Sequence, residues 1–237
     1  KMKEKKKSIR QFALPLAFRK VRNKNNFILN DSNKFALSLV DKFRDVKNFK
    51  EKYNFPVLII YGPKGCGKSH LANVYSEITK GEFISKLDNK IINQAKLGRS
   101  FIIDDFDKLS NLDENLFIHF FNEITFNLGS LLIVTTQPPS SIKFKLLDLR
   151  SRIKSCVSAK IDLPNDEVLY SILVKELSDK KLFLDDKLCF YVIKRVKRNY
   201  NTILEFSDRL DKCSLEKKNK INLKDLREII NDLNIES

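Results

Sequence analysis

One segment constrains the fold of this chain more than any other. Residues 62–69, Gly-Pro-Lys-Gly-Cys-Gly-Lys-Ser, match the pattern G-x-x-x-x-G-K-[S/T] without a gap. Glycines with this spacing let the backbone turn its N–H groups inward around an anion, and the following helix presents its positive end. The segment lies between an apolar run, residues 55–60, and a helical pattern that begins at Ser69. This context favours a phosphate-binding loop over a glycine turn that merely connects two elements.

The loop defines a first set of candidate binding residues. Lys68 is expected to reach the β- and γ-phosphates of a nucleotide, and Ser69 is expected to bind Mg²⁺. His70 follows the serine, and a histidine taken alone more often packs or caps than binds. The full set expected around the phosphates is Gly62, Pro63, Lys64, Gly65, Cys66, Gly67, Lys68, Ser69 and His70.

Apolar runs of similar character recur along the first two thirds of the chain. Residues 101–105 and 131–136 resemble the run before the loop, and residues 157–163 form a weaker fourth run. Unbroken aliphatic runs suit strands that are buried on both faces, as in a parallel sheet. Helical patterns lie between them, such as residues 115–128 with apolar positions on one face. Strands alternating with helices predict an α/β fold with a parallel sheet.

Helical patterns also flank this region. Residues 30–43 predict an amphipathic helix, with Asp31 or Ser32 as its cap. Beyond Pro164, Asn165 or Asp166 can cap a helix that continues to about Ser178. Three more helical patterns follow without a strand signal, at residues 185–197, 202–214 and 223–233. We therefore expect a flexible tail (1–20), an α/β nucleotide-binding domain (21–163) and a small all-helical domain (164–237).

Polar residues follow two of the expected strands. Asp104 and Asp105 end the strand at 101–103, where a carboxylate can hold the water shell of Mg²⁺ and a second acid can polarise an attacking water. We assign Asp104 to the metal and Asp105 as candidate base, with a simple turn as the alternative. Thr136 ends the next strand together with Thr135, and its hydroxyl can sense a γ-phosphate if this strand lies between the other two. The alternative is a strand-compatible threonine without a role.

Composition narrows the class of protein. A net charge of +15 favours contact with nucleic acid, but Lys, Asn and Ile are abundant together, which coding bias alone would also produce. Only residues 1–7 are dense in lysine, and a solvated terminus explains them as well. Four scattered cysteines and two histidines give no support to a zinc site or a disulfide framework. No apolar run is long enough to cross a membrane, so we expect a cytoplasmic protein with reduced thiols.

Together the motifs resemble the DnaA family of AAA+ ATPases. The resemblance covers the chain from about residue 25 and rests on residues 27–37, 62–71, 101–109, 134–142 and 146–155. It implies an AAA+ domain with a five-stranded parallel sheet and a helical lid, with ATP or ADP and Mg²⁺ between them. It also makes Arg152 the candidate arginine finger, which in this family reaches into the nucleotide site of a neighbouring subunit. Arg150 is the second choice, and a surface arginine without this role is the alternative.

The chain departs from DnaA initiators in two places. Asn201 occupies the position of the family's sensor arginine, and the nearest basic residue is Arg198. The sequence also stops at Ser237, after the expected lid, where an initiator would continue into a DNA-reading helix-turn-helix domain. The second of these features, and a tail hexapeptide at residues 11–16, are similar to the Hda-like regulators of this family.

The hexapeptide Gln-Phe-Ala-Leu-Pro-Leu resembles the Q-L-x-L-P-L motif with which Hda-like proteins dock on the sliding clamp of the replicase. The residues that would make this contact are Gln11, Phe12, Leu14, Pro15 and Leu16. Proline keeps such a segment extended, and the apolar side chains would fill a groove on the partner. The alternative is a tail that folds back over its own sheet edge.

Three functions fit these features. The first is a regulator that is tethered to the clamp and promotes hydrolysis of ATP bound to the DnaA initiator, with at most weak ATPase activity of its own. The second is a self-contained, DnaC-like helicase loader that hydrolyses ATP while its basic surface holds DNA. The third is a degenerate initiator relative in which nucleotide is a structural prop. Weak non-specific DNA contact and homo-oligomer formation are compatible with the first function.

Overall fold

A parallel sheet positions the phosphate-binding loop. The computed structural model describes residues 30–108, 112–217 and 222–235, so the expected clamp-docking residues of the tail lie outside the described part. Within that part, five strands pair in the order β2-β3-β4-β1-β5, and every pairing is parallel. They are β1 (Val57–Tyr61), β2 (Glu82–Phe83), β3 (Ser100–Ile103), β4 (Ser130–Thr135) and β5 (Val157–Lys160). The expected five-stranded parallel sheet is confirmed.

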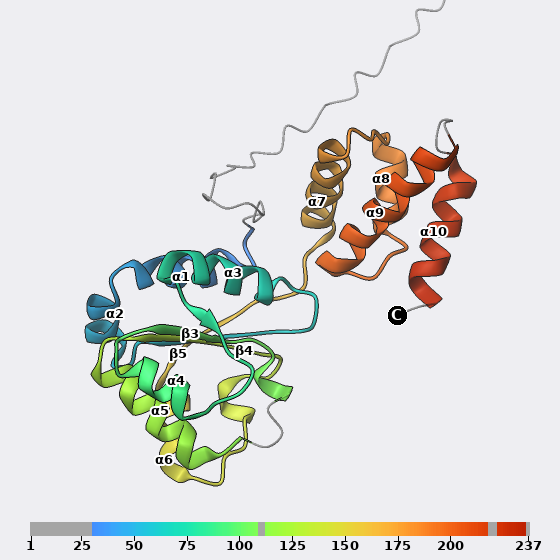
Figure 1. Cartoon of the computed structure of the whole chain (residues 1–237). Helices are drawn as coiled ribbons and strands as arrows, with labels where there is room; N and C mark the ends of the chain where they lie inside the picture. Colours follow the sequence, from blue (N-terminus) through green and yellow to red (C-terminus); the bar gives the residue numbers. More distant parts are fainter. Residues whose placement is uncertain (1–29, 109–111, 218–221, 236–237) are drawn as a thin grey trace, which may run out of the picture.

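Helices cover both faces of the sheet (Figure 1). One face carries α1 (Lys34–Asp41), α2 (Val46–Tyr53) and α3 (Lys68–Thr79); the other carries α4 (Asn89–Ala95), α5 (Glu114–Phe126) and α6 (Leu147–Ser155). Strands β1, β3 and β4 are largely apolar because successive side chains point to opposite faces and both faces are buried there. In β1, Leu58 and Ile60 join the core under α1 and α3, whereas Val57 and Ile59 join the core with α5.

The C-terminal part is helical. It comprises α7 (Asp166–Asp179), α8 (Asp186–Ile193), α9 (Tyr200–Lys217) and α10 (Leu223–Ile235), which enclose a hydrophobic core of their own. Asn165 caps α7, because its side chain accepts a hydrogen bond from the Val168 N–H at 2.9 Å. None of the described helices is long and apolar enough to span a membrane.

Two local predictions differ from the structure. The N-cap of α1 is Asn33, not Asp31 or Ser32, and its side chain accepts from the Asn30 N–H rather than from the helix. Ser32 is unavailable as a cap because its N–H and hydroxyl both donate to the Asn30 side chain. Strand β2 was not predicted, since two exposed residues carry no periodic pattern.

Candidate functional site

The phosphate-binding loop leaves the start of α3 open to an anion. Gly67, in the left-handed conformation at φ 99°, is the N-cap of this helix and offers no side chain to its first N–H groups. These donors therefore keep their affinity for a phosphate oxygen. Lys68 is 7% exposed, and its ammonium donates to the carbonyl oxygens of Gly62 and Pro63 at 2.7 Å each. A bound phosphate would take this cation over from the loop's own carbonyls.

The helical part contacts the loop through two consecutive residues. The Tyr200 N–H donates to the Gly65 carbonyl oxygen at 3.1 Å. Asn199 lies so close that a Cβ on Gly65 would come within 2.3 Å of the asparagine Cβ, and Gly65 also has a φ of +78°. Asn199 at the same time caps the start of α9, because its side chain accepts from the Thr202 N–H at 2.7 Å. The first turn of α9 is thereby fixed against the phosphate-binding loop.

Tyr200 joins three distant parts of the sequence. A Cβ on Gly67 would lie 3.3 Å from its ring, and its hydroxyl accepts a hydrogen bond from Asn30 Nδ2 at 3.1 Å. Burial raises the pKa of the Tyr200 hydroxyl above its usual value, so the side chain is a neutral phenol at physiological pH. Asn30 belongs to the segment that precedes α1. The helical part (α7–α10, called the lid below), the loop and this N-terminal segment therefore meet at one side chain.

A cleft of about 760 Å³ opens between the loop and the helical part. Lys64, Gly65, Gly67, Lys68 and Ser69 form one wall, and His70 and Asn73 extend it along α3. Opposite them, α7 and the first turn of α9 supply side chains that include Lys175, Tyr200 and Asn201. Of the other predicted binding residues, Gly62, Pro63 and Cys66 belong to the loop but do not line the cleft. Gly62 has a structural role, since a Cβ there would meet the Ile161 carbonyl oxygen at 2.0 Å.

The ends of β3 and β4 close one part of this cleft. Asp105 and Thr136 line it, and the Asp105 carboxylate pairs with the Lys108 ammonium. Asp104 is half-buried and does not line the cleft, and its carboxylate accepts from the Asp105 N–H at 3.0 Å. Strand β4 lies between β1 and β3, so the threonines occupy the place expected of a sensor.

Asp107 is a residue that the sequence reasoning missed. Its carboxylate accepts from the Thr135 hydroxyl at 2.7 Å and from the Thr136 N–H, which fixes the end of β4. Burial opposes ionisation of Asp107, but the hydrogen bonds from Thr135 and Thr136 outweigh it and lower the pKa of the carboxyl group. The available signal was an acid four residues after β3, but the Asp104–Asp105 pair lies closer to the strand end and was the more obvious candidate.

Known proteins resemble this chain in sequence. A DnaA initiator of Thermodesulfovibrio yellowstonii is 28% identical over 198 residues, which is 74% of this chain and 44% of the initiator. The chain thus spans less than half of that relative. An uncharacterised Haemophilus influenzae protein is 26% identical over 192 residues, 74% of this chain and 82% of the relative. The family model that matches residues 58–133 is described as RNA helicase.

Solved structures agree with the sequence matches. Domain III of the Thermotoga maritima replication initiation protein DnaA superimposes with a TM-score of 0.69 at 20% identity, over 87% of this chain and 94% of that domain. The chain carries a DnaA-like AAA+ domain. A DnaA initiator bound to AMPPCP and single-stranded DNA also resembles it, with a TM-score of 0.64 at 19% identity over 81% of this chain and 64% of that one.

In this DnaA-like domain, Arg152 lies away from the cleft. Its Nε donates to Asp148 Oδ1 at 3.0 Å and its Nη1 donates to Asn122 Oδ1 at 2.6 Å. The guanidinium also lies 5.9 Å from the ring centre of Phe121, and the side chain stays 29% exposed. Arg198 is likewise engaged elsewhere, in an ion pair with Asp166 at 2.9 Å. Among the described residues that line the cleft, there is no arginine.

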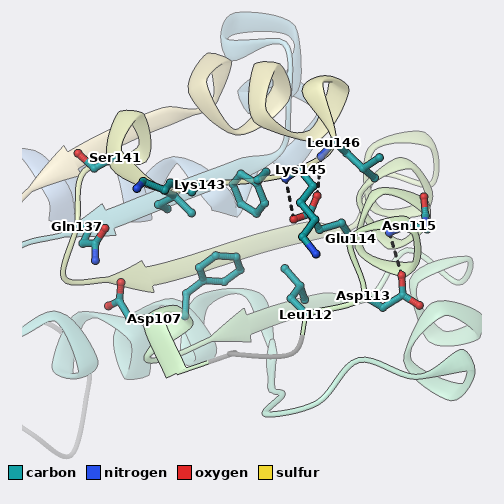
Figure 2. Close-up of a pocket in the computed structure, with 13 residues that line it drawn as sticks. Asp107, Leu112, Asp113, Glu114, Asn115, Gln137, Ser141, Lys143, Lys145 and Leu146 are labelled. Carbon is teal, nitrogen blue, oxygen red and sulfur yellow. Dashed lines mark hydrogen bonds between the residues drawn. The ribbon is translucent and has the colours of Figure 1, made fainter.

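The start of α6 is held in place by Glu114, which lines a second cleft of about 950 Å³ (Figure 2). This cleft lies between the segment after β3 and the segment that leads from β4 to α6. The two carboxylate oxygens of Glu114 accept from the Lys145 N–H at 2.9 Å and the Leu146 N–H at 2.7 Å. Glu114 therefore attaches the entry of α6 to the start of α5, and both helices together present Arg152.

Proposed function

We propose that the cleft binds ATP or ADP. The observations that support this are the uncapped start of α3, the buried Lys68 whose ammonium donates to two carbonyl oxygens of the loop, and the closeness of the helical part. Neighbours of the same fold have been solved with AMPPCP, an ATP analogue. Loop N–H groups and Lys68 would hold the phosphates, and Tyr200 and Asn30 would close the cleft beside them.

The predicted metal residues fit Mg²⁺. Ser69 lines the cleft beside Lys68, and Asp104 directly follows strand β3. Mg²⁺ in phosphate sites keeps several waters and uses one or two protein oxygens besides the phosphate oxygens, so a hydroxyl and a water-linked carboxylate suffice. The described part of the chain contains no cluster of three or more metal-ligating side chains, which such a site does not need.

We propose further that the chain is a regulator of replication initiation whose arginine finger acts on the DnaA initiator. The single observation that carries this proposal is the position of Arg152. It is presented by α5 and α6, outside a cleft whose described lining has no arginine. An arginine placed in this way can complete the nucleotide site of a neighbouring molecule, where its planar cation stabilises charge on the γ-phosphate.

Two sequence features support this regulator. Residues 11–16 resemble the clamp-docking motif, so the sliding clamp of the replicase is the proposed tether. Asn201 brings no charge into the chain's own cleft, so we propose that turnover there is weak and that the main hydrolysis takes place on the initiator. The uncharacterised Haemophilus relative, most of whose length is matched, is a natural homologue for comparison.

Phosphate release from ATP-loaded initiator tests the proposal. Wild-type protein with clamp should stimulate release, and Arg152→Ala should abolish the stimulation, because an arginine finger contributes on the order of a thousandfold or more. Lys154→Ala removes another exposed cation from α6 and should leave the stimulation intact. Arg150→Ala tests the second choice for the finger.

The same assay tests the tether and the alternative function. Replacing Gln11 and Leu16 together by alanine should abolish the stimulation that clamp supports and should retain full ADP binding. Unchanged stimulation by this double variant would refute the tether. Brisk ATP hydrolysis by the chain alone on single-stranded DNA would instead establish the helicase-loader function, and DnaA in complex with single-stranded DNA has a similar fold.

A further inference from the structure

Helix α7 forms part of the wall that faces the phosphate-binding loop. Ile172, Lys175, Glu176 and Asp179 all line the cleft. Their spacing of three and four residues places them on one side of the helix. The side chain of Lys175 is 22% exposed, so α7 brings a largely buried cation to the cleft from the lid side.

The Lys175 ammonium is held by two acids of its own helix. Its Nζ lies 3.1 Å from Asp179 Oδ2 and 3.5 Å from Glu176 Oε1. Asp179 is 57% exposed at its side chain, so water screens this pair and its contribution to stability is small. A phosphate oxygen could therefore replace Asp179 as the partner of Lys175 at little cost.

The other lysines that line the cleft do not come from the lid: Lys64 and Lys68 belong to the loop, and Lys108 follows β3. Lys68 reaches out of the loop itself and is expected at the β- and γ-phosphates, and Lys108 is paired with Asp105. Asn201, which stands on the lid wall, is uncharged. A nucleoside triphosphate carries one more phosphate group than a diphosphate, and the loop N–H groups serve the α- and β-phosphates. The additional negative charge thus lacks a cation from the lid unless α7 supplies it.

We propose that Lys175 binds the terminal phosphate of a nucleoside triphosphate and so makes the lid distinguish ATP from ADP. This inference rests on the proposed nucleotide binding and adds a residue from a different helix than the one that carries Asn201. In the absence of the terminal phosphate, Asp179 and Glu176 hold Lys175. When the phosphate is present, the ammonium exchanges Asp179 for a phosphate oxygen, which draws α7 toward the loop.

The chain offers a closely matched control. Lys180 is also on the lid, its side chain is also 22% exposed, and it also pairs with Glu176, at 3.8 Å. Its second partner is Asp208 on α9, at 3.0 Å. Lys180 does not line the cleft. Lys175→Met and Lys180→Met therefore remove equivalent charges from similar surroundings, and only one of them faces the proposed ligand.

Calorimetric titration of the full chain with AMPPCP and with ADP, both with Mg²⁺, tests the inference. Lys175→Met should weaken AMPPCP binding by roughly tenfold, as expected for loss of one charged hydrogen bond, and leave ADP binding within twofold. Lys175→Arg should restore most of the loss. Asp179→Asn, which frees Lys175 and removes a negative charge, should strengthen AMPPCP binding, and Lys180→Met should change neither nucleotide.

The outcomes separate this inference from the nucleotide proposal. If wild type binds ADP and AMPPCP but Lys175→Met and Lys180→Met bind AMPPCP equally, the role of Lys175 is refuted and nucleotide binding stands. Equal losses for ADP and AMPPCP in Lys175→Met also refute it, because the residue would then not recognise the terminal phosphate. If wild type binds neither ligand, both proposals fail together.

Discussion

The hydroxyl of Tyr200 accepts a hydrogen bond from Asn30 Nδ2 at 3.1 Å, across 170 residues of sequence. Asn30 precedes α1 and Tyr200 is the first residue of α9, and the tyrosine also contacts Gly65 and Gly67 of the loop. Any movement of the lid relative to the loop must either break this hydrogen bond or move Asn30 together with Tyr200. The pair is therefore a direct reporter of lid position.

Tyr200→Phe should loosen the lid without disturbing its core. The variant loses one hydrogen bond of about 1 kcal/mol, which should speed amide exchange at the start of α9 roughly fivefold and weaken ADP binding by a similar factor. Hydrogen exchange read by mass spectrometry measures the first effect. As a control, Tyr191→Phe deletes a hydroxyl that accepts from Arg227 Nε at 3.2 Å within the lid. Equal effects of both variants on ADP binding would contradict the special role of Tyr200.

Gly65→Ala should weaken nucleotide binding. The added Cβ would come within 2.3 Å of the Asn199 Cβ, and φ +78° strains any residue with a side chain. The loop or the lid must then shift, which we expect to cost at least tenfold in ADP affinity by titration. Gly98→Ala is a fair comparison, because it has a φ of +70° and its Cβ would lie 2.7 Å from the Asn127 carbonyl oxygen, away from the cleft. It should lower the melting temperature and retain ADP affinity.

The stability of the protein should depend on Asp107 in acid. Hydrogen bonds lower the folded-state pKa of this carboxyl group below the unfolded value of about 4, so its contribution is complete above that pH and is lost as the pH falls through the folded-state pKa. In thermal unfolding between pH 7 and pH 3, the melting temperatures of wild type and Asp107→Asn should differ at neutral pH and converge as the pH falls. Thr135→Val removes one donor and should give an intermediate curve. A constant difference across the range would argue against the linkage.

The thiol of Cys66 should resist modification although it lies in the loop. The residue is 1% exposed, and burial raises the pKa of its thiol, so little thiolate is present at neutral pH. In the folded protein a thiol reagent should label Cys213 first, because Cys66, Cys156 and Cys189 are buried. Peptide mapping after brief labelling measures the order. Early labelling of Cys66 would mean that the loop opens readily.

The sheet could be predicted because its signals are local. The apolar runs identified β1, β3, β4 and, more weakly, β5, and the Gly-Lys-Ser motif after β1 located the loop. The expected place of the β4 threonines between the two neighbouring strands follows from the same reasoning, and the strand order agrees. Strand β2 escaped because its two residues have no period to detect.

The contacts around the site could not be predicted because they depend on tertiary structure. Asp107 looks like one more acid after a strand, and only the fold brings it to Thr135. Tyr200 directly precedes Asn201, which occupies the sensor position, yet its own contacts are with Gly65 and Asn30, which are far away in sequence. Likewise, nothing in the pattern around Lys175 indicates that one side of α7 faces the loop.

The junction at Asn199 makes α9 a lever. The helix has 18 residues, so it extends about 27 Å from the point at which it meets the phosphate-binding loop. A tilt of about 10° at that fulcrum would carry its far end through roughly 5 Å, given this length. Because α7 and α10 pack on α9 around a common core, they would travel with it. A displacement of about an ångström at Gly65 would thus become a larger movement of the exposed surface of the lid.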